Sequence, residues 1–491
     1  MSSTLIEKLS AEGGGESVRF LNDIVTHLWP NINVAVSKMI KEVAEPMFKT
    51  MLPGPLATLH FTKIDLGQVP MVLSDVLTTK TETGDIKLDM NVAWAGKCDI
   101  QLDGNMIPAL GVKGVALNGK LSILLGPLTD ILPLIGAAQI AFVNPPDLKL
   151  DFTGAAELAD MDMIDGAVRG VIASIINSIL VLPNRYLYKL DAANDYFKTQ
   201  IYPLGMIRIT VEKAWEFNQE KQSASQKFLS KLTRDSPDAY CKVAVGAEET
   251  WQTTTKNNTT SPVWNEVHDF VVTDFDQCIT IDMFDEDVGS DDHIGFAATT
   301  VRDLLSASGK QELSMVRKEK PVPGKIALSS KFYRFAAEDS SFSASDHSAE
   351  GLLCGVATIL IAGAFDIPGN RKELNPSVIV TWGEKHHFQT AIITDAPGTD
   401  INNPAFDTTF RISTTAAMVG SGAQGFRIAL MNKKVEIGSV EVPLSDIIKA
   451  PDMTLQNQFD VGSGAKVRAS ICLRGIMPAT MEETHLPLRQ K

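Results

Sequence analysis

The chain has 491 residues and a formal net charge of −14, from 45 basic and 59 acidic side chains. This length is too great for one hydrophobic core and predicts roughly three to five domains. The 44% of hydrophobic and 21% of charged residues exclude a wholly disordered chain. The acidic balance argues against nucleic acid as a partner, because such proteins need a cationic surface. Attraction to an anionic membrane would therefore need a local patch or a bound cation.

No segment is predicted to cross a membrane or to direct export. The two longest apolar runs, 131–143 and 352–365, are shorter than the roughly 18–20 residues that a spanning helix needs. Residues 1–16 are polar and contain no apolar signal region. The five cysteines are widely scattered and form no Cys-x-x-Cys pair. We interpret them as reduced, mostly buried thiols of a cytosolic protein.

Residues 17–190 combine helical and strand patterns. Apolar residues recur at helical spacing through 17–50, with an interruption at Pro30, which predicts a helix. Apolar and polar residues alternate from Ile86 to Trp94, and similar segments follow, which predicts half-buried strands. A stripe of isoleucines then predicts a second helix that ends before Pro183. We expect an α+β domain whose apolar strand face is turned inward.

Beyond residue 204 the sequence is typical of all-β sandwiches and contains an internal repeat. Short apolar strands alternate with turn residues. The segment that begins Pro262-Val263-Trp264 returns as Pro404-Ala405-Phe406, and an Ile-Gly pair ending at Gly295 returns at Gly438 with nearly the same spacing. Two matches at one offset predict duplicated domains over 204–336 and 351–476. The acidic, serine-rich residues 337–350 between them predict a solvated linker.

An acidic loop follows one predicted strand of the first repeat. Residues 282–292 contain six Asp or Glu and no Lys or Arg. Such crowding of carboxylates is costly unless a cation neutralises it, and hard oxygen ligands favour Ca²⁺. The spacing excludes an EF-hand, because Ser290 and Phe296 stand where that motif needs Gly and Glu. A merely solvated acidic loop is the alternative.

The first repeat resembles the C2 domain. The resemblance rests on Asp238-Ala239-Tyr240, on the segment 261–266, on Asp285-x-Asp287 and on Asp291-Asp292 before His293-Ile294-Gly295. In that family, aspartates of two loops hold Ca²⁺ at one tip of an eight-stranded sandwich, which implies docking on anionic membrane phospholipids. The aspartate expected earlier in the first loop aligns with Gln226, and Asp235 is a substitute. The implied calcium ligands are Asp235, Asp238, Asp285, Asp287, Asp291 and Asp292.

The second repeat lacks these carboxylates. Asn375-Pro376-Ser377 replaces the Asp-x-Tyr segment, and Met431-Asn432-Lys433-Lys434 replaces the aspartates of the third loop. We expect a C2 domain that does not depend on calcium. The two lysines either contact lipid phosphate or form a solvated basic turn.

The N-terminal region resembles the synaptotagmin-like mitochondrial lipid-binding (SMP) domain. The motifs Leu59-x-Phe61-x-x-Ile64-x-Leu66-Gly67, Gly111-Val112-Lys113-Gly114 and Leu180-Val181-Leu182-Pro183-Asn184-Arg185 stand in the expected order within 17–190. With two C2 domains after it, the chain resembles the extended synaptotagmins and the plant synaptotagmins. The implied fold class is multidomain, α+β and all-β: a tubular, TULIP-like lipid-binding barrel followed by two C2 β-sandwiches.

This resemblance implies that the apolar strand face lines a lipid tunnel instead of a solid core. The expected cargo is a bound glycerophospholipid, and homodimerisation through the SMP domain is implied as well. Relatives carry an N-terminal membrane hairpin, which we do not expect in the sixteen mostly polar residues before this domain. The expected location is the cytoplasmic side of endoplasmic reticulum–plasma membrane contact sites, as a peripheral protein. The expected lipid-contacting residues are Leu88, Met90, Val92, Ile100, Val115, Leu117, Leu121, Ile123, Leu148, Leu150 and Ile175.

Three functions compete on the sequence alone. The first is lipid transfer combined with membrane tethering, with Ca²⁺-dependent docking by the first C2 domain. The second is a scaffold whose barrel is filled by side chains. The third is a lipid-modifying enzyme, which we do not expect, because the sequence contains no Gly-x-Ser-x-Gly elbow, kinase signature or P-loop.

Overall fold

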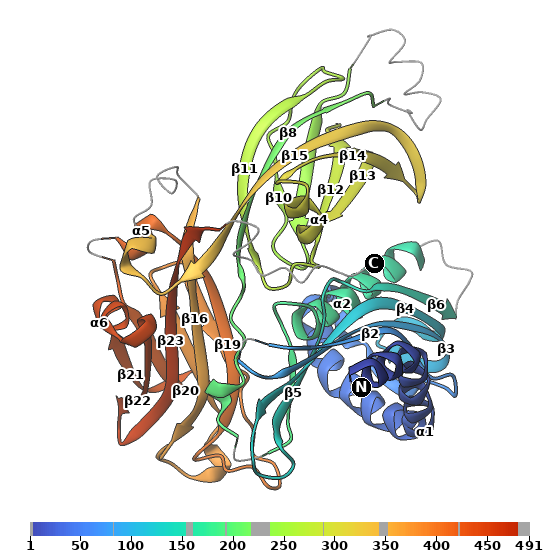
Figure 1. Ribbon diagram of the computed structural model, residues 1–491. Helices are drawn as coiled ribbons and strands as arrows, with labels where there is room; N and C mark the ends of the chain where they lie inside the picture. Colours follow the sequence, from blue (N-terminus) through green and yellow to red (C-terminus); the bar gives the residue numbers. More distant parts are fainter. Residues whose placement is uncertain are drawn as a thin grey trace. The chain divides into compact units, whose positions relative to one another are not determined.

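The structure is a computed structural model that describes residues 3–81, 83–153, 161–191, 194–217, 236–287, 289–342, 352–420 and 423–479. The chain forms two compact units, Met1–Asn194 and Asp195–Lys491. Each unit is described by itself below (Figure 1).

The first unit is a curved antiparallel sheet covered by two helices. The strands run in the order β1-β3-β4-β5-β7, with β2 paired to β3 and β6 paired to β4. The helices are α1 (Ser3–Met51) and α2 (Met161–Leu180), with a 3-10 turn η1 (Gly54–Thr58). The strands are β1 (His60–Asp65), β2 (Val72–Lys80), β3 (Ile86–Gly104), β4 (Ile107–Leu128), β5 (Ile135–Phe142), β6 (Asp147–Thr153) and β7 (Tyr186–Lys189).

Helix α1 is longer than the sequence pattern predicts. It begins at Ser3 instead of residue 17 and continues through Pro30 and Pro46. Proline removes a helical hydrogen bond, so contacts outside the helix must hold the two sides together. Beside Pro30, the buried Trp29 donates its indole N–H to the Gly67 carbonyl at 2.9 Å. One turn further, the Asn33 side chain bonds Asp65 and the backbone N–H of Leu66.

One end of this unit is a filled core. Phe48 of α1, Leu59 and Leu102 are each almost completely buried. Val171 of α2 packs into the same cluster, with Ile100 and Ile175 at its margin. The helices therefore cover this end of the sheet completely.

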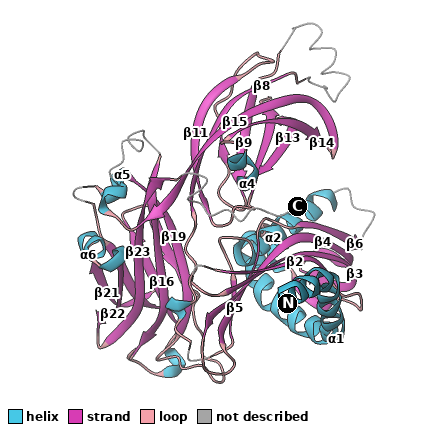
Figure 2. Ribbon diagram, viewed as in Figure 1, coloured by secondary structure: helices cyan, strands magenta, loops and turns pink. Residues whose placement is uncertain are grey.

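The second unit begins with an eight-stranded sandwich. Its two layers have the strand orders β10-β9-β12-β13 and β14-β15-β8-β11, and they are linked where Phe296 of β13 pairs with Val316 of β14. Figure 2 shows that strands make up nearly all of the sandwich. The helix α4 (Val301–Ser306) is capped by the Thr300 side chain, which accepts from the Asp303 N–H. The strands are β8 (Gly205–Trp215), β9 (Ala239–Val245), β10 (Trp251–Gln252), β11 (Val263–Val272), β12 (Cys278–Asp285), β13 (Asp292–Thr300), β14 (Lys310–Arg317) and β15 (Lys320–Ala336).

A second sandwich repeats this topology, so the predicted duplication is confirmed. Its sheets have the orders β18-β17-β20-β21 and β22-β23-β16-β19. Even a local irregularity recurs: Asn265 and Asp407, each three residues after the repeated proline, have positive φ angles of 52° and 43°. The strands are β16 (Leu353–Phe365), β17 (Pro376–Trp382), β18 (His386–Gln389), β19 (Ala405–Thr415), β20 (Phe426–Asn432), β21 (Val435–Val442), β22 (Thr454–Gly462) and β23 (Ala465–Pro478). Short helices α5 (Ala416–Val419) and α6 (Leu444–Lys449) connect some of them.

The two sandwiches are joined by backbone pairing and a buried ion pair. The end of β15 pairs with the end of β23, with Tyr333 opposite Pro478. Arg208 and Asp269 are both buried and bond at 2.8 Å, and Asp269 also accepts the Leu353 N–H at 2.9 Å. A buried charge is stable only when its polar atoms are satisfied, so Asp269 links the first sandwich to the start of β16.

The segment between the sandwiches is not wholly solvated, contrary to our expectation for 337–350. The 3-10 turn η3 (Asp339–Phe342) carries the buried Ser341, whose hydroxyl bonds the Glu338 carbonyl. Phe342 packs on the core of the second sandwich. The first part of the predicted linker therefore belongs to that sandwich, and 343–351 lie outside the described residues.

The connector before β8, residues 195–204, packs on the second sandwich at its start and joins the first at its end, where the Leu204 N–H bonds the Val272 carbonyl at 2.8 Å. Asp195 bonds Arg468 of β23 through both carboxylate oxygens at 3.0 Å. The Arg468 guanidinium also lies over the Phe197 ring, 4.7 Å from its centroid. The buried Tyr196 shares a hydrogen bond of 2.7 Å with Thr409 of β19. The second sandwich thus holds a segment that is continuous with the first.

Candidate lipid-binding face and calcium-binding tip

Strand register places the predicted lipid-contacting residues of the sheet on one face. Directly opposed residues of neighbouring strands project to the same side. Leu88 of β3 lies opposite Ile123 of β4, and Met90 lies opposite Leu121. On the other side of β4, Leu117 lies opposite Leu148 of β6.

The burial of the side chains on this face changes along the length of the sheet. Met90 and Val92 are buried in a cluster that includes Leu21 and Val25 of α1. Next to them Leu88, Leu117, Leu121 and Ile123 are only half-buried, although they are aliphatic. A second cluster, with Val115 at its centre, holds Ile100, Leu148 and Leu150.

Ile175 lies on α2, at the filled end described above, together with Ile100. The face therefore passes from a closed core to a stretch of half-exposed aliphatic side chains. Contact of any of these residues with lipid stays a prediction.

Three neighbouring strands bring the predicted calcium ligands to one tip of the first sandwich. Asp238 directly precedes β9, Asp285 ends β12 and Asp292 begins β13. In the ladders, Asp285 lies opposite both Ala239 and Asp292. The acidic positions of the first and third loops therefore converge, as the C2 resemblance implies.

Asp285 also has a structural role at this tip. Its side chain is buried and accepts the backbone N–H of Asp238 at 2.7 Å. The Asp238 side chain in turn accepts the N–H of Asn258 at 2.6 Å. Asp285 thereby ties the third loop to the first, and Asp238 ties the first loop to the turn after β10.

Asp291 is oriented by a tyrosine. The hydroxyl of the buried Tyr240 donates to Asp291 at 2.6 Å, and the Asp287 N–H approaches the other carboxylate oxygen at 3.3 Å. The Tyr240 bond, followed by that of Asp287, lowers the pKa of Asp291 below its ordinary value. Burial and the bond to Asp291 raise the pKa of Tyr240 to about 12. Asp291 is thus ionised and held toward the outer sheet face.

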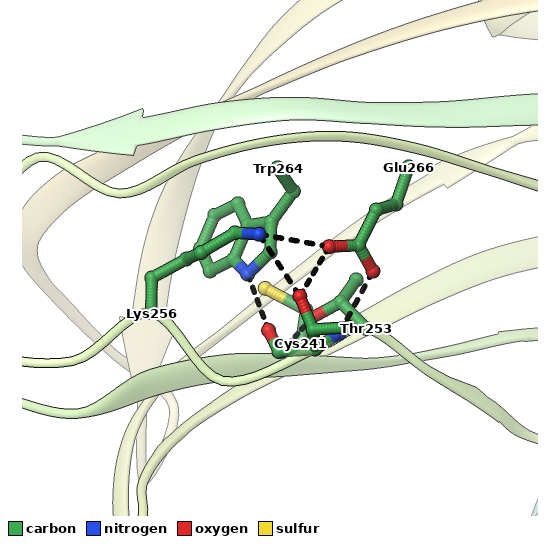
Figure 3. A network of polar contacts seen from close by, with 6 residues as sticks. Cys241, Thr253, Lys256, Trp264 and Glu266 are labelled. Atoms are coloured by element: carbon green, nitrogen blue, oxygen red, sulfur yellow. Dashed lines mark hydrogen bonds and ion pairs between the residues drawn. The ribbon is translucent and has the colours of Figure 1, made fainter.

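A polar network supports the turn that carries Asn258 (Figure 3). The Trp264 indole donates to the Thr254 carbonyl at 2.9 Å, and Glu266 accepts from the Thr254 N–H at 2.8 Å and from Lys256 at 3.1 Å. Burial alone would raise the pKa of Glu266, but the bonds from Thr254 and Lys256 outweigh it and lower that pKa. Lys256 pairs through its backbone with Ala239, so this network fixes the segment beside Asp238.

The donor set at the tip is of the kind that calcium prefers, since it consists of carboxylate oxygens. Within the described residues, however, no three Asp, Glu, His or Cys side chains are gathered closely enough to hold a metal ion. Asp287 is exposed, and Asp291 and Asp292 also lie at the tip. Asp235 and Gln226 lie outside the described residues. The structure thus shows convergence of the loops without a formed metal cage.

The tip of the second sandwich has the same backbone arrangement without the carboxylates. Asn432 accepts the backbone N–H of Asn375 at 2.8 Å, and the Lys433 N–H donates to the Asn375 carbonyl at 3.0 Å. Asn432 ends β20 opposite Pro376, as Asp285 ends β12 opposite Ala239. Lys433 and Lys434 are exposed.

Two residues with positioning roles were not found by sequence reasoning. Asn258 holds Asp238, and Tyr240 holds Asp291. Asn258 has a positive φ of 54°, and the Asn257-Asn258 pair is a turn signal that could have indicated it. Tyr240 was noted only as part of the Asp-x-Tyr resemblance, and nothing in that spacing shows its bond to Asp291.

Comparison with known proteins agrees with this architecture. The family described as the synaptotagmin-like mitochondrial-lipid-binding domain matches residues 14–190, and the C2 domain family matches 205–315 and 355–459. A solved structure of extended synaptotagmin 2, which holds its SMP domain and two C2 domains, superposes with a TM-score of 0.64 at 26% identity. The match covers 94% of this chain and 99% of that one.

The curated proteins that are similar to this chain are extended synaptotagmins as well. Human extended synaptotagmin-2 is 26% identical over 479 residues, which cover 94% of this chain and 50% of that protein. Extended synaptotagmin-1 of Mus musculus is 31% identical over 299 residues, or 60% of this chain and 27% of that protein. The chain thus spans about half the length of the extended synaptotagmin-2 relatives that it matches.

The fold and the family matches define an SMP domain followed by two C2 domains. The chain is homologous to the extended synaptotagmins, with which it shares this order of domains. In the described part of the chain, no helix combines the length and the apolar character needed to cross a bilayer.

Proposed function

We propose that this protein transfers glycerophospholipids between membranes at organelle contact sites and tethers those membranes. The observation that supports transfer most directly is the apolar face of β3, β4 and β6. Leu88, Leu117 and Ile123 share this face and are only half-buried. Exposure of aliphatic surface to water costs roughly 25 cal/mol per Å² in free energy. An acyl chain that covered these side chains would therefore be bound by the same hydrophobic contribution.

Docking is proposed to be controlled by calcium through the first C2 domain. Without the ion, the carboxylates of Asp238, Asp285 and Asp287 make the tip repel anionic lipid. A bound Ca²⁺ would reverse the local charge and offer coordination positions to lipid phosphate oxygens. The second C2 domain has Asn432 in place of an acid and is proposed to act without calcium.

Lipids copurified with the whole chain, identified by mass spectrometry, test the cargo. We expect glycerophospholipid at a defined ratio to protein. Sedimentation with phosphatidylserine vesicles in calcium and in chelator tests the switch. Equal sedimentation in both would contradict calcium control and leave the cargo result untouched.

A scaffold without transport is the second candidate. The observation that favours it is the filled end, where Phe48, Leu59 and Leu102 are buried in one core cluster of side chains. If that packing continued along the whole face, the purified protein would carry no lipid, and vesicles would be tethered without exchange of fluorescent lipid.

The proposed location is the cytoplasmic side of endoplasmic reticulum–plasma membrane contacts, and homodimerisation through the SMP domain stays a prediction. Both rest on the resemblance to the extended synaptotagmins. Light microscopy of the tagged protein with markers of the two membranes tests the location.

A further inference from the structure

One hairpin of the SMP domain exposes a group of large aliphatic side chains. The turn between β4 and β5 carries Leu128, Ile131, Leu132 and Leu134, whose exposed fractions are 45%, 68%, 83% and 49%. Figure 1 shows the β4–β5 hairpin extending away from α1 and α2. Scattered exposed apolar residues are ordinary, but four within seven positions of one turn form a patch, and such patches mark interaction sites.

The charge around this turn suits an uncharged partner surface. Between Lys120 and Asp147 the only charged residue is Asp130. The neighbouring segment brings Lys189 and Asp191, which are of opposite sign, beside Ala137 and Gly136. An anionic membrane drawn by electrostatic attraction would need an excess of cations here, and one carboxylate offers little to a protein partner held by many ion pairs. A zwitterionic or neutral bilayer needs none.

The turn also satisfies much of its own backbone. The Thr129 N–H donates to the Leu134 carbonyl at 2.9 Å, and the Leu134 N–H donates to the Ile131 carbonyl at 2.7 Å. The Thr129 hydroxyl donates to the same Ile131 carbonyl at 3.0 Å, and Pro133 has no N–H. Backbone polar groups that enter lipid are costly unless they are bonded within the protein, so these bonds lower the cost of insertion.

Along the neighbouring strand β7, an aliphatic side chain near the turn is followed by tyrosines further from it. Leu190 lies beside the turn, because its N–H bonds the Gly136 carbonyl. Further from the turn, Tyr188 lies opposite Ala138 and Tyr186 opposite Ile140, with exposed fractions of 58% and 37%. Aliphatic residues at a tip with tyrosines behind them match the depth profile of a bilayer, where tyrosines lie at the headgroup level.

The apolar face of the sheet extends toward the patch and reaches Leu125, three residues before Leu128. One row of opposed residues runs from Leu88 through Ile123 and Ile140 to Tyr186. A second row runs from Leu125 through Ala138 to Tyr188. A lipid that left a bilayer at the turn would therefore meet an apolar surface that leads to Leu88.

We propose that the turn 128–134 inserts into a zwitterionic or neutral bilayer and is the point where acyl chains pass between the bilayer and the SMP domain. This second part rests on the proposed lipid transfer. Insertion itself is independent of calcium and of the C2 tip. The SMP domain thus has a membrane contact of its own.

The test uses the whole chain with an environment-sensitive fluorophore on Leu132→Cys. The matched control is Met106→Cys in the β3–β4 turn, at the other end of β4, where Met106 is 92% exposed. The unsubstituted chain measures labelling of the native cysteines, of which only Cys278 is not buried. With phosphatidylcholine vesicles in chelator, we expect a several-fold rise in emission at 132, quenching by brominated lipid, and no change at 106. No change at 132 would overturn the proposal.

A charged variant tests entry of the acyl chains. Ile131→Asp with Leu132→Asp should melt like the wild type, since both side chains are exposed, and should keep its copurified lipid. Exchange with phosphatidylcholine vesicles should slow about tenfold or more, because charges are costly in the bilayer. Met106→Asp should exchange at the wild-type rate. If the wild type carries no lipid but inserts at 132, the proposed transfer fails and insertion stands.

A second copy of the chain is the competing occupant of the patch. Sedimentation of wild type and of the double aspartate variant, without vesicles, distinguishes the two. A wild-type dimer that the variant converts to monomer would overturn the proposal, since the patch would then be covered by protein. An unchanged sedimentation coefficient supports it.

Discussion

Asp285 and Asn432 make the same hydrogen bond in the two C2 domains. Each side chain ends its strand and accepts a backbone N–H from the first loop, that of Asp238 at 2.7 Å and that of Asn375 at 2.8 Å. Asn432 shows that a neutral amide supports this frame. Asp285 therefore combines a structural role, which the amide can fill, with a charge that the frame does not need.

Asp285→Asn should leave the fold intact and remove calcium-dependent docking. The amide oxygen keeps the bond to Asp238, so unfolding in chelator should change by less than about 0.5 kcal/mol. Asp285→Ala leaves the buried N–H without an acceptor and should cost about 1–3 kcal/mol. Chemical unfolding in chelator and sedimentation with phosphatidylserine vesicles in calcium measure the two effects. Sedimentation of Asp285→Asn like the wild type would show that this carboxylate is not a ligand.

The two roles of Asp285, a structural hydrogen bond and a charge, show how much of the site could be predicted from the sequence. Strand alternation places the acids of 282–292 on one loop, and the C2 resemblance implies that they lie near Asp238. The structure brings Asp238, Asp285 and Asp292 together at one tip, while calcium binding stays a prediction. The bonds of Asp285 to Asp238 and of Tyr240 to Asp291 depend on side-chain directions that spacing does not contain. An acidic loop predicts a cation, but it does not show which acids already have partners.

The fold shows a similar limit. Alternation predicted β3, and the repeat predicted two sandwiches, because both patterns are visible in the order of residues alone. The passage of α1 through Pro30 depends on Trp29 and Asn33, whose partners lie more than thirty positions away. Packing of the connector on Arg468 joins residues 273 positions apart. Tertiary contacts that overrule local propensity leave no local signal.

Stability of the turn beside Asp238 should depend on pH through Glu266. Its folded pKa is lowered below the ordinary 4.5, so the stabilisation is present above that value and is lost as pH falls through the folded pKa. Glu266→Gln should weaken the turn by about 1 kcal/mol at pH 7, and this difference from wild type should disappear as the pH falls through the folded pKa. Hydrogen exchange of the Thr254 amide, which Glu266 accepts at 2.8 Å, measures this. A constant difference at all pH values would exclude the ionised carboxylate as the cause.

Arg468→Ala should release the connector from the second C2 domain. The variant loses both bonds to Asp195 and the contact with Phe197. Because both charged side chains are partly exposed, we expect a loss of about 1 kcal/mol and faster proteolysis between 190 and 204. Arg427→Ala is the matched control, since Arg427 pairs with Glu436 of the same domain. Equal cleavage rates in the two variants would show that Arg468 does not hold the connector.

Leu88→Trp with Leu117→Trp separates a lipid-lined face from a filled core. Both side chains are half-buried and lie on the face shared with Ile123. If lipid occupies the space before them, two indoles displace it without overpacking. The variant should then melt within a few degrees of the wild type, lose its copurified phospholipid and stop transferring fluorescent lipid between vesicles.

If side chains fill that space instead, each enlargement should destabilise by roughly 1–3 kcal/mol, and the wild type should carry no lipid. Leu102→Trp is the control for a filled site, because Leu102 is 3% exposed in the closed end of the domain. It should lower the melting temperature under either interpretation. If the double variant melts early and the wild type carries no lipid, lipid transfer is contradicted. The scaffold without transport would then be the remaining function.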